Sequence, residues 1–473
     1  MSRILETLIL SLCAGTAAQA VEAVCSQTQP VFYAGLEKQP LLRVRIADGQ
    51  AGKLDKLTFD FEGTSDLKSI GNVTLYCSGG TPYFSLNAPD HYRAKPVDMK
   101  MVKKGGREIS FAGNQNLPAS GDAYYWLVVD MKKSAPGNAK VDAECTNVTV
   151  NGQQAKIENP SPAGAAKVFP FKYRVVPYFR SSNLVDWFPD LLQPDHFKLI
   201  TDIIYFNVSV DQEGNIVGGE DPKFLQGLEK LKKLRGKRPV SIILGIAHSS
   251  PGLKATSASL DKRMKLAKTL GEYVKKHGFD GVDFDWEYPD NDEDWQNFAW
   301  LLCEVKPVLF EQGCSVTAAF TPYYKMASPS VLDQLDWGNT MSYDKGGEHS
   351  TMQAMLDDIN TCRKAGMPDC KIVAGVPFYS NEVENRNWDE QKGYSYIVSS
   401  FPRMKASENT FVDPKSKKKH YFNGPDLIKQ KGQEIIRQKI GGVMIWGYDT
   451  DVPLSNARSL SAALGNVMKA VAK

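Results

Sequence analysis

The pattern of apolar and polar residues changes near residue 160. From residue 30 to about 157, short apolar runs alternate with polar residues or contain β-branched and aromatic side chains, as at 41–46, 57–61 and 124–129. Turns rich in Gly, Pro, Asn and Asp separate these runs, and no long helical period interrupts them. This pattern is typical of an all-β sandwich, which we predict over residues 26–157.

A second pattern begins after residues 158–170, whose Pro, Ala and Gly content predicts a linker. Eight strand candidates follow, and apolar residues recur at helical spacing between several of them, for example over 260–274 and 295–309. Eight strand–helix units in roughly 300 residues indicate an α/β fold, a (β/α)8 TIM barrel over residues 171–473. A doubly wound sheet usually has a Gly-rich phosphate turn after its first strand, which is absent from this sequence. The predicted strands are 173–179, 200–208, 240–246, 281–287, 315–320, 337–343, 372–377 and 442–446.

The first 20 residues have the features of a cleaved secretory signal. Arg3 precedes an apolar core at 8–12, and Ala18-Gln19-Ala20 provides a cleavage site. We therefore expect a secreted or periplasmic protein. No later segment has eighteen uninterrupted apolar residues, so membrane insertion is not expected. A net charge of +3 is too small to indicate nucleic-acid binding.

Seven cysteines remain after removal of the signal, so at least one is unpaired or pairs between chains. Cys303 with Cys314, and Cys362 with Cys370, are close enough in sequence to bridge a helix to the next strand. None lies in a CxxC pair, so a zinc site is not expected.

The most unusual stretch is 280–287, Asp-Gly-Val-Asp-Phe-Asp-Trp-Glu. In a strand, Asp283, Asp285 and Glu287 share one face because side chains alternate. Helical patterns on both sides predict a parallel strand that is buried on both faces. Three carboxylates in such a strand are costly unless they share protons and hydrogen bonds. We therefore interpret them as a catalytic row rather than a solvated edge.

In a (β/α)8 barrel, the chemistry takes place at the carboxyl ends of the strands. The residues at these ends are mainly aromatic and acidic, which suits sugar rings with apolar faces and hydroxyl edges, and they offer few basic groups for phosphate. They are Tyr178, Phe206, His248, Glu287, Tyr323, Tyr343, Asp344, Tyr379 and Trp446.

The motif Asp-Gly-x-Asp-x-Asp-x-Glu at 280–287 resembles the signature of glycoside hydrolase family 18, the chitinases and related endo-N-acetylglucosaminidases. Met-Ser-Tyr-Asp at 341–344, Gly-Val-Pro-Phe-Tyr at 375–379 and the run ending in Trp446 resemble further motifs of this family, in the same order. The resemblance extends from about residue 172 to the end of the chain. Residues 61–76 are similar to a β-sandwich module of bacterial secreted sialidases.

The resemblance implies hydrolysis with retention of configuration, assisted by the substrate. Many retaining glycosidases use a carboxylate nucleophile, whereas family 18 uses the 2-acetamido oxygen of the substrate to form an oxazolinium intermediate. Glu287 would be the general acid and later the base, and Asp285 would hold the acetamido N–H and stabilise the developing cation. Asp283 lies deeper, and we expect it to share a proton with Asp285.

The family also implies roles for the other residues at the strand ends. Tyr343 would donate a hydrogen bond to the acetamido oxygen, and Trp446 would lie beneath the reacting sugar. No metal or organic cofactor is required. The remaining substrate-binding candidates, which line the pocket or lie at its edge, are Met341, Tyr178, Phe206, Asp344 and Tyr379.

Two features depart from the family pattern. The third strand ends Leu-Gly-Ile-Ala-His at 244–248, where the family usually has Ser-x-Gly-Gly. The segment between Tyr379 and Trp446 is short and resembles that of members without an α+β insertion, which predicts a shallow, open groove.

Three functions fit these residues. The first is a chitinase that cleaves β-1,4-linked N-acetylglucosamine in chitin or chitooligosaccharides. The second is an endo-β-N-acetylglucosaminidase that acts on glycoprotein N-glycans. The third is a non-catalytic chitin-binding lectin on the same fold. Trp286 and the Tyr-Pro pair at 288–289 favour the first, and the complete acidic row disfavours the third.

Overall fold

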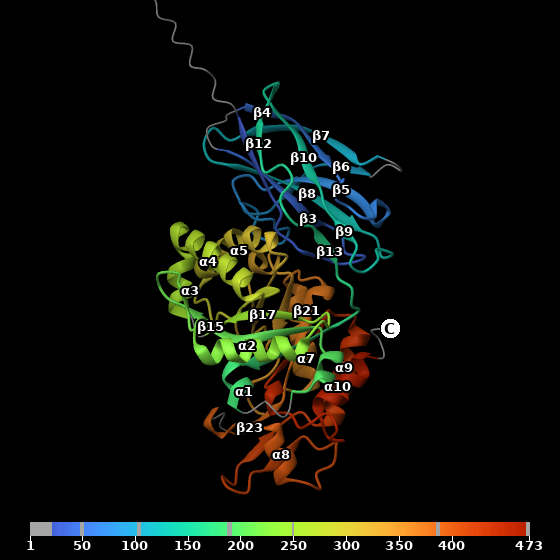
Figure 1. Ribbon diagram of the computed structural model, residues 1–473, viewed down its shortest axis with the longest axis vertical. Coiled ribbons are helices and arrows are strands. Elements are labelled where there is room, and N and C mark those ends of the chain that lie inside the picture. Colours follow the sequence, from blue (N-terminus) through green and yellow to red (C-terminus); the bar gives the residue numbers. More distant parts are fainter. Residues whose placement is uncertain are drawn as a thin grey trace, which may run out of the picture.

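The computed structural model describes residues 21–47, 52–101, 106–186, 192–247, 250–384 and 388–469. The predicted signal segment and His248 lie outside these ranges. A β-sandwich forms one end of the molecule, a barrel the middle, and a small lobe containing α8 and β23 the opposite end (Figure 1). Within the described ranges, no helix is long and apolar enough to cross a lipid bilayer.

Two mainly antiparallel sheets form the predicted N-terminal β-sandwich. Their inward-facing residues, such as Val44, Phe59 and Val129, form a hydrophobic core separate from that of the barrel. One sheet has the order β12-β1-β3-β8-β5-β6, and its strands are Lys156–Glu158, Glu22–Ser26, Gln39–Ile46, Ala123–Met131, Ile70–Cys77 and Lys95–Met101. The other has the order β11-β10-β4-β7, with strands Gln153–Gln154, Glu144–Val150, Gly52–Asp60 and Glu108–Leu117.

Eight parallel strands close into the predicted barrel, because β14 pairs with both β26 and β15. The predicted strands 315–320, 372–377 and 442–446 have the observed bounds. In order along the chain, the barrel strands are β14 (Arg174–Arg180), β15 (Asp202–Val210), β17 (Ser241–Ile246), β18 (Gly281–Phe284), β19 (Ser315–Phe320), β20 (Trp337–Thr340), β21 (Ile372–Pro377) and β26 (Gly442–Trp446). The longer helices around them are α2 (Pro222–Arg235), α4 (Leu260–His277), α5 (Asp292–Glu311), α7 (Met352–Lys364), α9 (Pro425–Gln438) and α10 (Leu460–Lys469).

Helix α4 sets the start of the strand that carries the acidic row. Leu266, Leu270 and Val274 recur on one face and are buried against the barrel. The helix ends at His277 and is capped by Gly278, whose φ of 59° lies in the left-handed region that glycine adopts without steric cost. The chain can therefore turn sharply and enter β18 three residues later.

The predicted strand 281–287 is too long, because β18 ends at Phe284. The amide of Asp285 still donates to Ile246 O at 2.8 Å, so the ladder continues for one more hydrogen bond. Glu287 lies in the loop that follows. The alternation of side chains along a strand therefore accounts for the position of Asp283 but not for that of Glu287, which lies beyond the end of the strand.

The segment between β21 and β26 contains a small α+β insertion, so the prediction that this insertion is absent was wrong. A four-stranded sheet has the order β23-β22-β25-β24 and is accompanied by helix α8 (Tyr394–Ser400). Its strands have two to four residues, too few to produce a period-two pattern in the sequence. They are β22 (Tyr379–Glu382), β23 (Lys392–Gly393), β24 (Thr410–Val412) and β25 (Lys419–Tyr421).

The expected linker at 158–170 includes a strand of the N-terminal sheets. Strand β13 (Ala166–Val168) pairs with β2 (Val31–Phe32) and β9 (Lys140–Val141). The ordered contacts of the N-terminal part therefore continue to residue 168, almost to the first barrel strand.

All seven cysteines in the described ranges are free thiols. The two pairs that are close in sequence do not form bridges. Cys303 Sγ donates to Pro82 O at 3.1 Å, and Cys314 Sγ donates to Phe279 O at 3.2 Å.

Buried polar contacts join the sandwich to the amino ends of the barrel strands. Tyr33 donates its hydroxyl proton to Asp336 O at 2.9 Å and accepts from Arg174 Nη2 at 3.4 Å. Arg174 also pairs with Asp202 at 2.9 Å, and both side chains are almost fully buried. The sandwich therefore covers the barrel at the end away from the carboxyl ends of its strands.

We predict that Tyr33→Phe lowers the free energy of unfolding by about 1–2 kcal/mol, because the buried Arg174 and the Asp336 carbonyl lose a hydrogen-bond partner. Urea denaturation followed by tryptophan fluorescence would measure the change. Tyr396→Phe, which removes a half-buried hydroxyl bonded to Asp413 in the insertion, is the matched control. Equal stability of Tyr33→Phe and the wild type would show that this contact does not hold the two parts together.

Candidate active site

The three carboxylates at the end of β18 run from the barrel interior to the surface. Asp283 is fully buried, Asp285 is 5% exposed, and Glu287 is exposed. Glu287 is therefore the most accessible of the three carboxylates.

Three neighbouring strands supply hydrogen-bond donors to Asp283. Tyr178 of β14 donates to Oδ2 at 2.7 Å, whereas Thr317 of β19 and Asn339 of β20 donate to Oδ1, the latter at 3.2 Å. Burial raises the pKa of Asp283 to about 6, although these hydrogen bonds oppose the shift. Asp283 is therefore a fixed acceptor beneath the site.

Asp285 is coupled to Glu287. Burial, and then the charges of Glu287 and Asp283, raise the pKa of Asp285 well above its usual range, and its carboxyl group is hydrogen-bonded to that of Glu287. We had expected Asp283 and Asp285 to share a proton, but both oxygens of Asp283 accept from the three donors above. Because two adjacent carboxylates cannot both be charged cheaply, the coupling of Asp285 to Glu287 favours a proton shared by these two groups.

Aromatic residues surround this row. Trp446, at the end of β26, is half-buried and packs edge-on against Tyr178 and Phe206, with ring centroids 5.7 and 5.1 Å apart. Met341, Tyr343 and Tyr379 belong to the same cluster inside the barrel. Tyr178 therefore lies beneath the predicted floor residue, with its hydroxyl group directed at Asp283.

Tyr343 presents a hydroxyl proton near the acidic row. Burial, with the charges of Asp344, Asp285 and Glu287, raises the pKa of Tyr343 well above its usual range. Its hydroxyl group points at Met444 Sδ, 3.8 Å away, which is only a weak acceptor. The group is therefore available to donate to a better acceptor.

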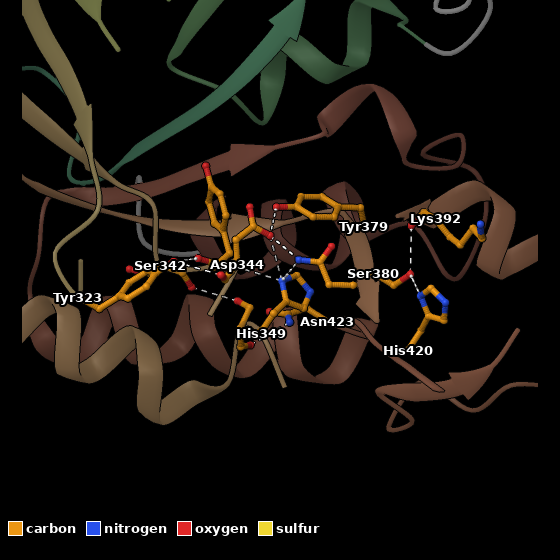
Figure 2. Close-up of polar contacts among 12 residues, drawn as sticks. Tyr323, Ser342, Asp344, His349, Tyr379, Ser380, Lys392, His420 and Asn423 are labelled. Carbon is orange, nitrogen blue, oxygen red and sulfur yellow. Dashed lines mark hydrogen bonds and ion pairs between the residues drawn. The ribbon is translucent and has the colours of Figure 1, made fainter. Parts of the chain in front are cut away.

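Asp344 joins the barrel to the insertion (Figure 2). Its Oδ1 accepts from the Tyr379 hydroxyl group at 2.7 Å and from Asn381 Nδ2 at 2.6 Å. The Tyr323 hydroxyl group donates to Asp344 O at 3.1 Å. Tyr379, Asp344 and Tyr323 were predicted from strand ends, but Asn381 lies on a strand that the sequence did not reveal.

Sequence reasoning also missed Thr317 and Asn339. Each is a fully buried polar residue in a barrel strand that is buried throughout, and this pattern is the signal that could have identified them. In the part of the chain that the structure describes, no cluster of three His, Cys, Asp or Glu residues could hold a metal ion.

Two family models match the chain. Residues 174–451 match glycosyl hydrolases family 18, and residues 18–154 match the N-terminal domain of BNR-repeat neuraminidase. The first match extends over all eight barrel strands and includes Asp283, Asp285 and Glu287.

Among known proteins, Endochitinase 1 of Metarhizium robertsii is 26% identical over 299 residues, which cover 52% of this chain and 69% of the relative. A chitinase structure from Bacteroides thetaiotaomicron has a TM-score of 0.55 at 21% identity and covers 63% of this chain and 96% of its own. A mutant catalytic domain of the Ostrinia furnacalis Group II chitinase, solved with (NAG)5, has a TM-score of 0.53 at 20% identity and covers 63% of this chain and 97% of its own. The structural likenesses show the barrel fold. Because the family match covers more than half of the chain, this protein belongs to glycosyl hydrolases family 18.

Proposed function

We propose that this protein is a secreted or periplasmic chitinase that hydrolyses β-1,4-linked N-acetylglucosamine with retention of configuration. The observation that carries this proposal is the graded acidic row, in which the exposed Glu287 is hydrogen-bonded to the buried Asp285. The names of the similar proteins, Endochitinase 1 and chitinase, support the class of substrate.

Glu287 is the general acid in this proposal. It is the exposed member of a carboxyl pair that shares a proton, so it can carry that proton to the glycosidic oxygen. After the leaving group departs, the same carboxylate takes a proton from the incoming water. Asp285 remains buried and faces the reacting sugar as a hydrogen-bond acceptor.

The nucleophile is the acetamido oxygen of the substrate. Of the other two carboxylates in the row, Asp283 is engaged by three donors and Asp285 bonds to Glu287, so neither is presented as a free attacking group across the sugar. Asp285 would accept the acetamido N–H and stabilise the positive charge of the oxazolinium ion. The hydroxyl group of Tyr343 would donate to the acetamido oxygen and align it for attack.

The half-buried face of Trp446 forms the floor for the sugar, supported from below by Tyr178 and Phe206. Met341 and Tyr379 line the wall, and Asp344 contacts sugar hydroxyl groups at the edge. The strands of the insertion extend this wall beyond the barrel and would border the groove on one side. The steps of this mechanism use these side chains, the substrate and one water molecule.

We predict that Glu287→Gln lowers kcat at least 10²-fold while oligosaccharide binding survives, because the amide has no proton to give and general acid catalysis contributes about 10²–10⁴-fold. Turnover of chitotetraose and calorimetric binding would measure both effects. Glu293→Gln, an exposed glutamate at the start of α5, is the matched control. Near-normal turnover of Glu287→Gln would mean that another residue is the acid. Cleavage of a high-mannose glycoprotein but not of chitotetraose by the wild type would contradict the proposed substrate.

Substrate assistance predicts that cleavage requires a 2-acetamido group on the reacting sugar. A chitosan oligomer with a free amine at that position should bind without being cut there, because an amine cannot form an oxazoline. A stable thiazoline analogue of the intermediate should inhibit, and Asp285→Asn should weaken turnover and inhibition together. Efficient cleavage at a deacetylated sugar, or a covalent glycosyl–aspartate detected by mass spectrometry, would contradict this mechanism.

The raised pKa of Asp285 also predicts how stability depends on pH. A carboxyl group whose pKa is higher in the folded protein than its unfolded value of about 3.9 makes the protein lose stability as pH rises from that value through the folded pKa. Asp285→Asn removes this titration, so its unfolding free energy should fall less than that of the wild type between pH 4 and 8. The difference between the two proteins should widen as pH rises from about 4, and urea denaturation at each pH would measure it. Parallel curves for the two proteins would show that burial does not strain Asp285.

A further inference from the structure

Asp344 adopts a backbone conformation that its neighbours must maintain. Its φ is 61°, in the left-handed region that is uncommon for residues other than glycine but is found more often for Asp than for most, and its side chain is 17% exposed. The carboxylate lies at the edge of the site described above. Its direction therefore depends on the contacts that hold this turn.

A buried histidine, His349, lies directly behind Asp344 (Figure 2). The ring nitrogen Nδ1 is 3.4 Å from Asp344 Oδ1, and the ring is completely buried. Nδ1 also accepts two hydrogen bonds, from the backbone N–H of Asp344 and from Asn381 Nδ2, both at 3.3 Å. In the tautomer in which both groups donate to Nδ1, that nitrogen carries a lone pair, and the ring is neutral with its proton on Nε2.

The loop that carries His349 is fixed at both ends. Lys345 donates its backbone N–H to His349 O at 3.2 Å. Ser350 O accepts from Asn423 Nδ2 at 3.0 Å and from Lys431 Nζ at 2.9 Å. The ring therefore cannot turn away from Asp344 without breaking contacts to two other elements.

Charged and titratable groups face His349 from each element packed around it. Asp344 and Lys345 lie on its own loop, and Lys345 is paired with Asp358 of α7 at 2.8 Å. Lys431 approaches from α9, and the Tyr379 and Tyr421 rings approach from β22 and β25. Burial lowers the pKa of His349, Asp344 opposes this shift, and Lys431 adds to it.

We propose that His349 is a positioning residue that aligns Asp344 for substrate binding and makes this alignment depend on pH. The proposal rests on the proposed function for the role of Asp344 in the site. A neutral ring accepts hydrogen bonds from the backbone N–H of Asp344 and from the side chain of Asn381. The first contact holds the turn at Asp344, and the second holds Asn381, which in turn donates to the Asp344 carboxylate. A protonated Nδ1 has no lone pair and cannot accept either hydrogen bond, so the Asp344 amide or the Asn381 side chain must move away from it.

The direction of the pH effect follows from burial. Because its folded pKa lies below the ordinary value of about 6.5, His349 keeps the network intact at neutral pH and loses it as pH falls through that lower value. Substrate binding should therefore weaken on the acidic side, independently of the proton on the Asp285–Glu287 pair.

Two substitutions separate positioning from packing. Asn at 349 can place an amide oxygen near the position of Nδ1 and does not titrate, whereas Leu fills space without an acceptor. His349→Leu should raise KM for chitotetraose about tenfold, the size of one hydrogen bond, with kcat changed less than about threefold. His349→Asn should retain at least a third of wild-type kcat/KM at pH 7.5. As pH falls, its KM should rise less than that of the wild type, because only the wild type carries the titrating ring at this position.

His420→Asn is the matched control, because His420 is equally buried and bonds to Ser380 without a hydrogen bond to Asp344. The charge on Lys431, whose pKa is lowered to about 7 by burial, titrates in all these proteins, so comparison with His349→Asn isolates the histidine. Equal losses in His349→Asn and His349→Leu, or an unchanged acidic rise of KM in His349→Asn, would overturn the proposal.

An NMR titration of ¹⁵N-histidine-labelled protein tests the coupling without substrate. The His349 Nδ1 signal should be that of an unprotonated nitrogen at pH 7.5, and Asp344→Asn should lower the pH at which His349 titrates. A proton on Nδ1 at pH 7.5, or no change in Asp344→Asn, would contradict the proposal. If the NMR result holds but the wild type does not cleave chitotetraose, the proposed substrate is wrong and the positioning network stands.

Discussion

The burial of Asp283 and Asp285 in the barrel is the constraint on which the rest of the site depends. An isolated carboxylate in this interior would be costly, because protein surroundings solvate charge far less well than water. Asp283 is tolerated because Tyr178, Thr317 and Asn339 donate to it from three other strands. Asp285 has no such set of donors in the described contacts, and burial together with the charges of Glu287 and Asp283 raises its pKa, which favours its protonated form.

This arrangement explains how one row of similar side chains can supply different chemistry. In the proposed mechanism, Asp283 provides a fixed negative field, Asp285 is an acceptor whose ionisation is suppressed, and Glu287 is a proton donor at the surface. Such separation of carboxyl groups by environment is a general route to acid and base roles at one pH. On this proposal, the polar residues beneath the row serve the reaction although they occupy core positions.

The sandwich and the insertion lie at opposite ends of the long axis of the molecule, on opposite sides of the barrel. The sandwich contacts the amino ends of the barrel strands through Tyr33, Arg174 and Asp336, whereas the insertion packs against the carboxyl ends through Tyr379 and Asn381. Figure 1 shows these two parts at opposite ends. Changes in the sandwich are therefore expected to affect folding more than the acidic row.

The pattern of residues within single segments was enough to predict several barrel strands and the acidic row. Strands 315–320, 372–377 and 442–446 were predicted with their observed bounds, because buried parallel strands appear as continuous apolar runs. The acidic row was found because its spacing is a motif within one segment. The small insertion was missed because its strands are too short to show a period, and β18 was overextended because alternation alone does not show where a strand gives way to a loop.

The site contacts that were missed are long-range. Asn339 is 56 positions from its partner Asp283, and Asn381 is 37 positions from its partner Asp344. The sequence around either asparagine therefore does not indicate which residue it contacts. His349 lies only five positions from Asp344, but its role depends on Asn381 and on the loop contacts of Ser350. These relationships appear only when the barrel and the insertion are assembled.

The stereochemistry of the first product tests the central claim most directly. Proton NMR of chitotetraose hydrolysis, recorded within the first minutes before mutarotation, identifies the anomer at the newly formed reducing end. Attack by the acetamido oxygen followed by attack of water proceeds through two inversions, so the account predicts the β-anomer. Initial release of the α-anomer would show a single displacement by water and would contradict the mechanism built on Asp285 and Glu287.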